Sequence, residues 1–505
     1  MANSDTHTTA SNVSMPSIGR DAVLRGVVDV DRMARRLADA RAVPGVSVAI
    51  VHGDDTVHVD GYGLRHVDDE RARVDGDTVF QLASLSKPLA ATVVAALVGD
   101  GTVRWDTRIC EIDSGFRLHE DYPSAEVTVR DLFAHRSGLS GNAGNDLESL
   151  GFSRDDILRR VRFLRPTSSF RSAWDYSNFG LTEAAVAAAR AAGYTWEDAA
   201  EARLYTRVGM TSTSSRHRDF LRHDNRASLH VPFNGELKAL TTRNPDPQSP
   251  AGGASSSARD LAKWMRLELA LGRFNGEPIV NADAIAETHR PLVDRGVHPI
   301  YRAPSFYGLG WNVEFRSYGD VWGHAGAFSQ GARTLVTLVP SQKLGIVVLT
   351  NAFPTGVPEG LADSFLATVF GIETNRNWLA EWNTLYGSMF GPAIDAARAK
   401  YDNPPAHAMP PLAISAYAGT YANDYLGRAV VADTGGTLTL ALGPTDRSFT
   451  LQHFEGNVFT YRPYPETPQQ PVAATFAIGG DGHAVRLTLD DLNDNGQGDL
   501  VRSAR

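Results

Sequence analysis

The 505-residue chain has the composition of a globular protein, with 42% hydrophobic and 21% charged residues, and its length predicts two or three domains. A net charge of −9 and a pI near 5.9 argue against nucleic acid or an anionic membrane surface as a partner. The single cysteine, Cys110, excludes an internal disulfide and a cysteine-rich metal site.

Residues 1–24 are predicted to form a disordered N-terminus. The first part of this segment, 1–20, is rich in Ser, Thr and Asn and contains no apolar core of a signal peptide. No stretch of the chain approaches the roughly 18 apolar residues that a membrane-spanning helix needs. We therefore expect a cytoplasmic protein without a membrane span.

The spacing of apolar residues predicts the elements in chain order. A helix over 29–42 precedes a hairpin, whose strands 46–52 and 57–63 are joined at Gly53-Asp54-Asp55. Helical signals, each with Ser or Thr near the expected cap, then dominate the middle of the chain, at 154–163, 180–193, 195–206 and 256–272. Strands are predicted again at 307–315, 321–324, 334–339 and 345–350, followed by helices at 357–371 and 376–402.

A hairpin early and several strands late predict an α/β (α+β) fold. One antiparallel sheet would be closed by both ends of a domain spanning 25–375, with a mainly helical subdomain inserted over one edge. Paired prolines mark residues 376–411 as a helix and linker. The short alternating strands of 412–505, separated by Gly, Asp and Asn turns, predict a small all-β, barrel-like domain.

Ser84 ends a short apolar run, and Lys87 follows one turn later in an alanine- and valine-rich helix. Residues three apart on a helix are neighbours. A hydroxyl would therefore lie beside an amine at a helix end with free backbone N–H groups, which are the parts of an activated nucleophile. A serine that only caps the helix explains the same spacing, so other residues must separate the two interpretations.

Two further motifs favour the nucleophile. Tyr176 and Asn178 stand two apart in an extended stretch before a helix, so the phenol and the amide would face the same way. His324 precedes Gly326 on a predicted strand, where a glycine would let a substrate backbone approach closely. The alternatives are that Tyr176 and Asn178 are turn residues and that His324 packs beside Trp322.

In this order, Ser84-x-x-Lys87, Tyr176-x-Asn178 and His324-x-Gly326 resemble the motifs of the serine β-lactamase and penicillin-binding-protein superfamily. The resemblance is narrower to class C β-lactamase-related esterases and D-aminopeptidase-like peptidases. It covers about residues 25–370, with supporting phrases at 43–45, 131–139, 250–253 and 307–311. The region that opens at Tyr417 is similar to the lipocalin-like β-domain appended to some of these hydrolases.

The resemblance implies a role for each residue. Ser84 would be the acyl-accepting nucleophile, and Lys87 and Tyr176 would share its deprotonation and then protonate the leaving group. This needs an amine or phenol whose pKa is lowered toward neutrality by burial and nearby positive charge. The N–H groups of Ser84 and Ala327 would form the oxyanion hole. Asn178 would hydrogen-bond the substrate or hold Lys87.

His324 departs from true β-lactamases and many penicillin-binding proteins, which have lysine there. Both His324 and Gly326 are predicted to contact substrate. A histidine with an ordinary pKa of about 6.5 is mostly neutral at pH 7, so no permanent cation would await the carboxylate of a β-lactam or peptide. This favours esters, amides and short peptides, including those with D-residues, over β-lactams.

Two other segments only imitate functional motifs, and two more are expected to be structural. Ala327–Gly331 nearly spells G-x-S-x-G, but no strand, turn and helix fit around it. Asp491–Gly496 begins like an EF-hand loop, but Arg502 stands where that loop needs Glu, so a hairpin turn is predicted. A tight turn near the cleft is expected at 250–253, and His135 is expected to brace the wall of the site.

We therefore predict a serine hydrolase that acts through an acyl-Ser84 intermediate on a small-molecule or short-peptide substrate. No cofactor is expected, and the sequence contains no metal-binding motif. Two alternatives stay open: a β-lactamase or DD-carboxypeptidase, and a non-catalytic ligand-binding or sensor protein on the same scaffold. The oligomeric state, monomer or homo-oligomer, is also open, and the C-terminal domain is expected to restrict which substrates reach the cleft.

Overall fold

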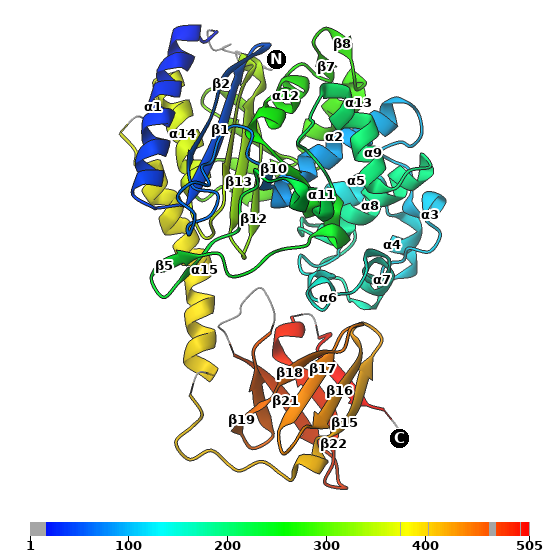
Figure 1. The fold of residues 1–505 in the computed structure, drawn as a ribbon. Helices are drawn as coiled ribbons and strands as arrows, with labels where there is room; N and C mark the ends of the chain where they lie inside the picture. Colours follow the sequence, from blue (N-terminus) through cyan, green and yellow to red (C-terminus); the bar gives the residue numbers. More distant parts are fainter. Residues whose placement is uncertain (1–16, 374, 402, 464–470, 495, 504–505) are drawn as a thin grey trace, which may run out of the picture.

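A computed structural model of the chain describes residues 17–373, 375–401, 403–463, 471–494 and 496–503. They form a large α/β domain and a smaller all-β domain, which the long helix α15 (Trp378–Tyr401) connects (Figure 1). Within these residues, no helix combines the length and the apolar character needed to cross a membrane.

The large domain is built on one antiparallel sheet. Its eight strands are β1 (Gly45–His52), β2 (Asp55–Gly63), β9 (Val293–Val297), β10 (Pro304–Tyr307), β11 (Asn312–Arg316), β12 (Gly319–Phe328), β13 (Ala332–Val339) and β14 (Leu344–Thr350). Their order is β2-β1-β14-β13-β12-β11-β10-β9. The N-terminal hairpin therefore pairs with the last strand of the domain, from Val46↔Thr350 to His52↔Leu344. The predicted fold, one sheet closed by both ends of the domain, is confirmed.

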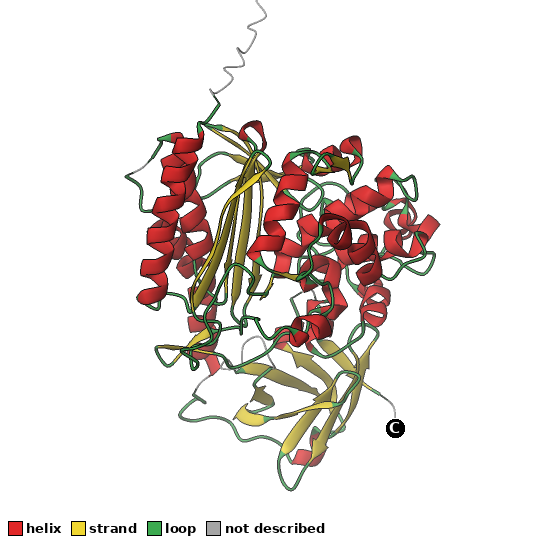
Figure 2. Ribbon diagram, turned by 45° about the horizontal axis from the view of Figure 1, so that its top comes forward, coloured by secondary structure: helices red, strands yellow, loops and turns green. Residues whose placement is uncertain are grey.

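The two faces of this sheet bury separate cores. Successive side chains of a strand point to opposite faces, so on β1 Val48 packs toward α1 (Arg20–Asp39) and α14 (Val357–Phe370), while Ala49 packs toward the helical part. Figure 2 shows α1 and α14 on one side of the sheet and the helices of the middle of the chain on the opposite side.

The helical part contains α2 at its centre, almost wholly buried, and several shorter helices around it. These helices are α2 (Ser86–Gly99), α3 (Ile109–Ile112), α4 (Asp121–Glu126), α5 (Val129–Phe133), α6 (Asn145–Ser149), α7 (Arg154–Arg160), α8 (Asn178–Ala191), α9 (Trp196–Ala200), α10 (Thr206–Val208), α11 (His217–Arg222), α12 (Ala258–Leu269) and α13 (Ala282–Ala286). Three two-stranded sheets complete it, formed by β3 (Phe80–Gln81) with β6 (Ser255–Ser256), β4 (Val231–Phe233) with β5 (Glu236–Lys238), and β7 (Arg273–Phe274) with β8 (Glu277–Pro278).

The start of α1 corrects a prediction. Residues 20–24, expected to be disordered, are helical, and the helix ends at Asp39. Val23 and Gly26 extend its buried stripe, and a Cβ at Gly26 would lie 2.7 Å from the Phe365 ring. The glycine thus lets α1 lie close against α14, although glycine weakens the helical signal in the sequence. The rest of the predicted disordered segment, 1–16, lies outside the described residues.

The small domain is a curled antiparallel sheet of nine strands, which are β15 (Gly419–Asn423), β16 (Gly427–Asp433), β17 (Leu438–Leu442), β18 (Arg447–Thr450), β19 (Gln452–Glu455), β20 (Val458–Tyr461), β21 (Val472–Ile478), β22 (Ala484–Leu489) and β23 (Asp499–Arg502). Its order is β18-β17-β16-β15-β23-β22-β21-β20-β19. The two edge strands, β18 and β19, are successive in the chain, so the sheet closes almost into a barrel. The predicted barrel-like architecture is confirmed.

Candidate active site

Ser84 lies in a single 3₁₀ turn, η1 (Ala83–Leu85), directly before α2. Ala83 has a φ of +49°, a conformation that costs energy for a residue with a side chain. The Ser86 hydroxyl supports this turn, because it donates to Ala83 O at 2.6 Å and accepts from Ala254 N at 3.0 Å. The predicted helix therefore begins two residues after Ser84, and the serine is held on a sharp turn of its own.

The Lys87 side chain is fully buried and turned toward Ser84. Its Nζ donates to Ser84 Oγ at 3.0 Å, to Asn178 Oδ1 at 2.7 Å and to the carbonyl oxygen of Ala251 at 3.0 Å. All three acceptors are uncharged. Burial lowers the pKa of Lys87 well below its usual value, since a charged amine is costly away from water. The site thus contains an amine suited to accept a proton.

Tyr176 lies on the other side of this amine, with Lys87 Nζ 4.4 Å from the centre of its ring. Burial raises the pKa of the Tyr176 phenol above its ordinary value, although its hydrogen bond to Ser84 and the charge of Arg295 act in the opposite sense. The lowered pKa that was expected for an amine or a phenol is therefore found at the amine, Lys87, and not at the phenol, Tyr176.

Asn178 is the first residue of α8, whose N-terminus is capped by Ser177. Its Oδ1 accepts from Lys87, as above, and its Nδ2 donates to Asn145 Oδ1 at 3.2 Å. Of the two roles predicted for Asn178, the structure displays the one that holds Lys87. His135 braces the same wall, because its Nδ1 accepts from Ser177 N at 3.1 Å and its ring lies 4.6 Å from that of Tyr176.

His324 is buried, and both of its ring nitrogens have partners within the protein. A backbone carbonyl can only accept, so Nδ1 carries the proton donated to Ala325 O at 2.7 Å, and Nε2 accepts from the Tyr307 hydroxyl at 2.9 Å. Burial and the charge of Lys87 lower the pKa of His324 well below its usual value. The neutral ring expected from the sequence is present, but its nitrogens bind neighbouring groups rather than facing an open cleft.

Gly326 and Ala327 lie on β12 where the strand passes the Ser84 turn. A Cβ at Gly326 would lie 2.1 Å from Leu82 O and 3.0 Å from Leu85 N. The space predicted for a substrate backbone is thus filled by the chain's own nucleophile turn. The pairing of β11 with β12 ends at Gly323, whereas β13 stays paired to Phe328. Residues 324–328 therefore have a free edge, where the N–H of Ala327 is available.

Three contributors to the site were missed from the sequence. Ala251 O, which accepts from Lys87, lies in one turn of π-helix, η5 (Ser249–Gly253), where a tight turn was expected. The sequence motif at 307–311 assigns no role to Tyr307, yet the hydroxyl of Tyr307 hydrogen-bonds to His324 Nε2. Arg295 lies on β9, an exposed edge strand whose glycine interrupts the strand signal, and its guanidinium stacks 4.7 Å from the centre of the Trp174 ring.

Comparison with known proteins assigns the family. The Beta-lactamase family matches residues 30–368, and the chain belongs to that family. The chain is therefore a hydrolase by class. A domain of unknown function, DUF3471, matches residues 403–499.

Similar proteins cover most of the chain. The unguisins hydrolase ungD′ of Aspergillus campestris is 26% identical over 78% of this chain and 75% of its own. Penicillin-binding protein 4 of Amycolatopsis lactamdurans is 27% identical over 65% of this chain and 84% of its own. The solved structure of an octameric penicillin-binding protein homologue from Pyrococcus abyssi covers 94% of this chain and 100% of its own, at 17% identity and a TM-score of 0.59.

Proposed function

We propose that this protein is a serine hydrolase in which Ser84 attacks an ester or amide carbonyl. The observation that carries the proposal is the buried Lys87 amine, 3.0 Å from Ser84 Oγ and bonded only to uncharged acceptors. Because burial lowers its pKa, the amine is available in its neutral form. That form donates to Asn178 and Ala251 and turns its lone pair to the Ser84 hydroxyl, whose proton it takes. The N–H groups of Ser84 and Ala327 would then hold the oxyanion.

The remaining steps follow from the protonation states. As Ser84 Oγ bonds to the carbonyl carbon, its proton passes to Lys87. When the bond to the leaving group breaks, the Tyr176 hydroxyl gives its proton to the departing oxygen or nitrogen, and Lys87 returns a proton to the phenolate. Water then hydrolyses the acyl-enzyme by the same route in reverse. Each proton moves between groups that lie around Ser84 Oγ.

The primary substrates proposed are small esters, amides and short peptides. Arg295 favours a second candidate, a carboxypeptidase-like or β-lactam-hydrolysing activity. Its guanidinium donates to Asn312 Oδ1 at 2.8 Å and to Ser305 Oγ at 3.3 Å, and within the described residues no carboxylate forms an ion pair with it. Its charge acts on both Tyr176 and His324. A substrate carboxylate would thus meet Arg295, although no lysine stands at 324.

Labelling with a fluorophosphonate probe tests the nucleophile. We expect one covalent adduct by intact mass on the wild type and on Ser172→Ala, an exposed serine that bonds only to Ser169 O. We expect none on Ser84→Ala; an undiminished adduct on that variant would refute the proposal. Arg295→Ala then separates the two candidates, because it should slow substrates that carry a carboxylate far more than matched substrates that lack one.

A further inference from the structure

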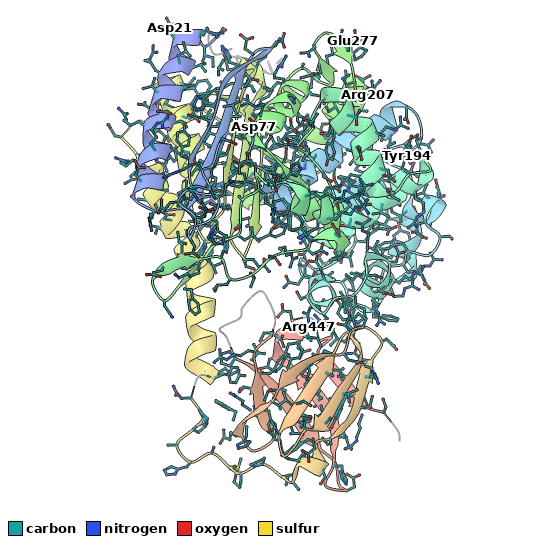
Figure 3. All side chains as sticks on the ribbon, in the orientation of Figure 1. Asp21, Asp77, Tyr194, Arg207, Glu277 and Arg447 are labelled. Atoms are coloured by element: carbon teal, nitrogen blue, oxygen red, sulfur yellow. The ribbon has the colours of Figure 1, made fainter. Side chains whose placement is uncertain are left out.

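The small domain contacts residues 141–149 of the large domain, a segment that carries α6, and also Arg160 on α7. Arg447, labelled in Figure 3 on the side of the small domain that faces the large one, donates to Ser149 O at 2.5 Å. At the other end of the segment, Asn142 Nδ2 donates to Asp494 Oδ2 at 2.9 Å. Both ends of the segment are therefore bonded to the small domain.

Tyr425 makes the buried contact between these ends, with only 3% of its surface exposed. Its hydroxyl accepts from Gly144 N at 3.0 Å and donates to Asp146 Oδ1. Its own carbonyl oxygen accepts from Arg160 Nη1 at 2.8 Å. A single phenol thus bonds two residues of the segment and leaves one residue, Asn145, between them.

Asn145 leads directly to the catalytic centre. Its Oδ1 accepts from Asn178 Nδ2 at 3.2 Å, and Asn178 Oδ1 accepts from Lys87 Nζ at 2.7 Å. The amide of Asn178 therefore has one end on the base and the other on the segment that Tyr425 holds. A displacement of Asn145 changes the orientation of the amide that fixes Lys87.

The segment also packs tightly against the start of α8. Gly144 has a φ of +84°, and a Cβ there would lie 2.7 Å from the Phe179 ring, next to Asn178. A Cβ at Gly141 would lie 3.1 Å from Tyr176 O. Because backbone of the segment lies against residues 176–179, its position is transmitted to both Tyr176 and Asn178 through contact.

We propose that Tyr425 is a positioning residue for Lys87, so that the small domain completes the catalytic centre from the other side of the domain boundary. The proposal rests on the proposed function, in which Lys87 is the base. Removal of the Tyr425 hydroxyl leaves the buried Gly144 N–H without its partner and takes one donor from the Asp146 carboxyl, which keeps Leu147 N and Gln497 Nε2. The unpaired Gly144 N–H favours opening of the segment and entry of water. Asn145 then no longer holds the amide of Asn178 in one orientation.

The test compares four full-length variants with the wild type: Tyr425→Phe, Asn145→Ala, their double variant, and Tyr421→Phe as the matched control. The Tyr421 hydroxyl is also buried, but it donates to Tyr417 O at 2.6 Å inside the small domain. The measurement is the rate of fluorophosphonate labelling of Ser84 as a function of pH. Thermal unfolding is followed in parallel.

We expect Tyr425→Phe to slow labelling about tenfold, the loss typical of one buried hydrogen bond. The acidic limb of the pH–rate profile of Tyr425→Phe should move to higher pH. Water that reaches Lys87 relieves the burial that lowers the pKa of the amine. The double variant should be no slower than Asn145→Ala, since both changes act on one connection. Tyr421→Phe should keep the wild-type rate and the wild-type limb.

A wild-type rate and limb in Tyr425→Phe would overturn the inference, and so would a double variant that loses the product of the two single effects. If Tyr425→Phe fails to fold, Asp146→Ala removes one of the two bonds of the Tyr425 hydroxyl from the side of the large domain, and the same criteria apply. An unlabelled wild type would refute the proposed function instead.

Discussion

Two buried cations lie on opposite faces of the central sheet, and their surroundings differ in one respect. Arg333, on β13, faces α14, where its Nε donates to Glu359 Oε1 at 2.9 Å and the Tyr386 hydroxyl bonds to the same oxygen at 3.0 Å. Lys87, on α2, is bonded to three neutral groups, and no carboxylate of the described residues bonds to it. Arg333 therefore has a counter-charge, whereas Lys87 has only uncharged hydrogen-bond partners.

This difference sets their protonation. Burial acts to lower the pKa of Arg333, but the charge of Glu359 and the hydrogen bonds of Arg333 to Glu359 and Tyr386 raise that pKa above its usual value. Burial of Lys87 meets no such compensation and lowers its pKa. A buried cation beside a carboxylate is held charged and supports the fold. A buried amine among neutral acceptors is available for proton transfer.

The largest effect should come from Lys87→Met, which keeps the length of the side chain and removes the amine. We expect acylation of Ser84 to fall about 10³-fold, within the range usual for a lost general base. Thermal stability should be unchanged or higher, because an unpaired buried amine is costly in the wild type. Labelling kinetics and thermal unfolding measure both; a variant that keeps wild-type acylation would remove Lys87 from the mechanism.

Glu359→Gln, beside Arg333, should lower stability and leave acylation almost unchanged. It leaves Arg333 buried without its counter-charge, and we expect a loss of about 3–5 kcal/mol in the free energy of unfolding. The acylation rate of the remaining folded protein should stay within about twofold of the wild type. Denaturant unfolding gives the first quantity and probe labelling the second, and a large rate loss at full stability would contradict the comparison.

The pH dependence should follow Lys87. Below its folded pKa the amine is charged and cannot accept the serine proton, so acylation should rise with pH through a value well below 10.5, the usual value for lysine. Unfolded Lys87 binds its proton up to the usual value, so this group makes the fold less stable as pH falls from 10.5 to the folded pKa. The wild type, but not Lys87→Met, should show both trends; a rate that rises only near 10.5 would contradict a lowered pKa.

The smallest effect is expected at His324. His324→Phe removes the acceptor of the Tyr307 hydroxyl, and the loss of one hydrogen bond predicts a decrease in kcat/KM of about two- to tenfold. The acidic limb should not move, because His324 is already neutral. Tyr307→Phe is the matched variant, and the pair should not be additive, since they share one bond. A shifted limb would show that His324 titrates in the mechanism.

The sequence predicts most of the fold because alternation and glycine turns mark the strands of both sheets. It misses β9, where Gly296 and the exposed Val297 leave little alternation, and it starts α1 too late because Gly26 lies in the buried stripe and weakens the helical signal. The start of α1 is stabilised by α14, which is distant in the chain, whereas β9 is an edge strand that pairs with β10 alone among the described strands.

For the site, local spacing places Ser84 beside Lys87, and the order of the motifs, with their resemblance to a known superfamily, selects Tyr176, Asn178 and His324. It could not identify Ala251, since a backbone carbonyl has no residue-type signal, nor the direction of the Tyr176 pKa, which depends on burial in the folded state. Nor could it show that Tyr425 contacts the large domain, because that contact joins residues 279 positions apart.

The contact of Gly326 with the turn that carries Ser84 also affects the order of steps in folding. Leu82 O, just before the nucleophile turn, accepts from Thr334 Oγ1 at 2.7 Å, across 252 positions of the chain. Contacts of such separation form slowly, so the turn that presents Ser84 acquires its shape only when β12 and β13 arrive. During refolding, the reactivity of Ser84 toward an acylating probe should therefore appear after secondary structure. The rate of this labelling then reports when folding of the large domain is complete.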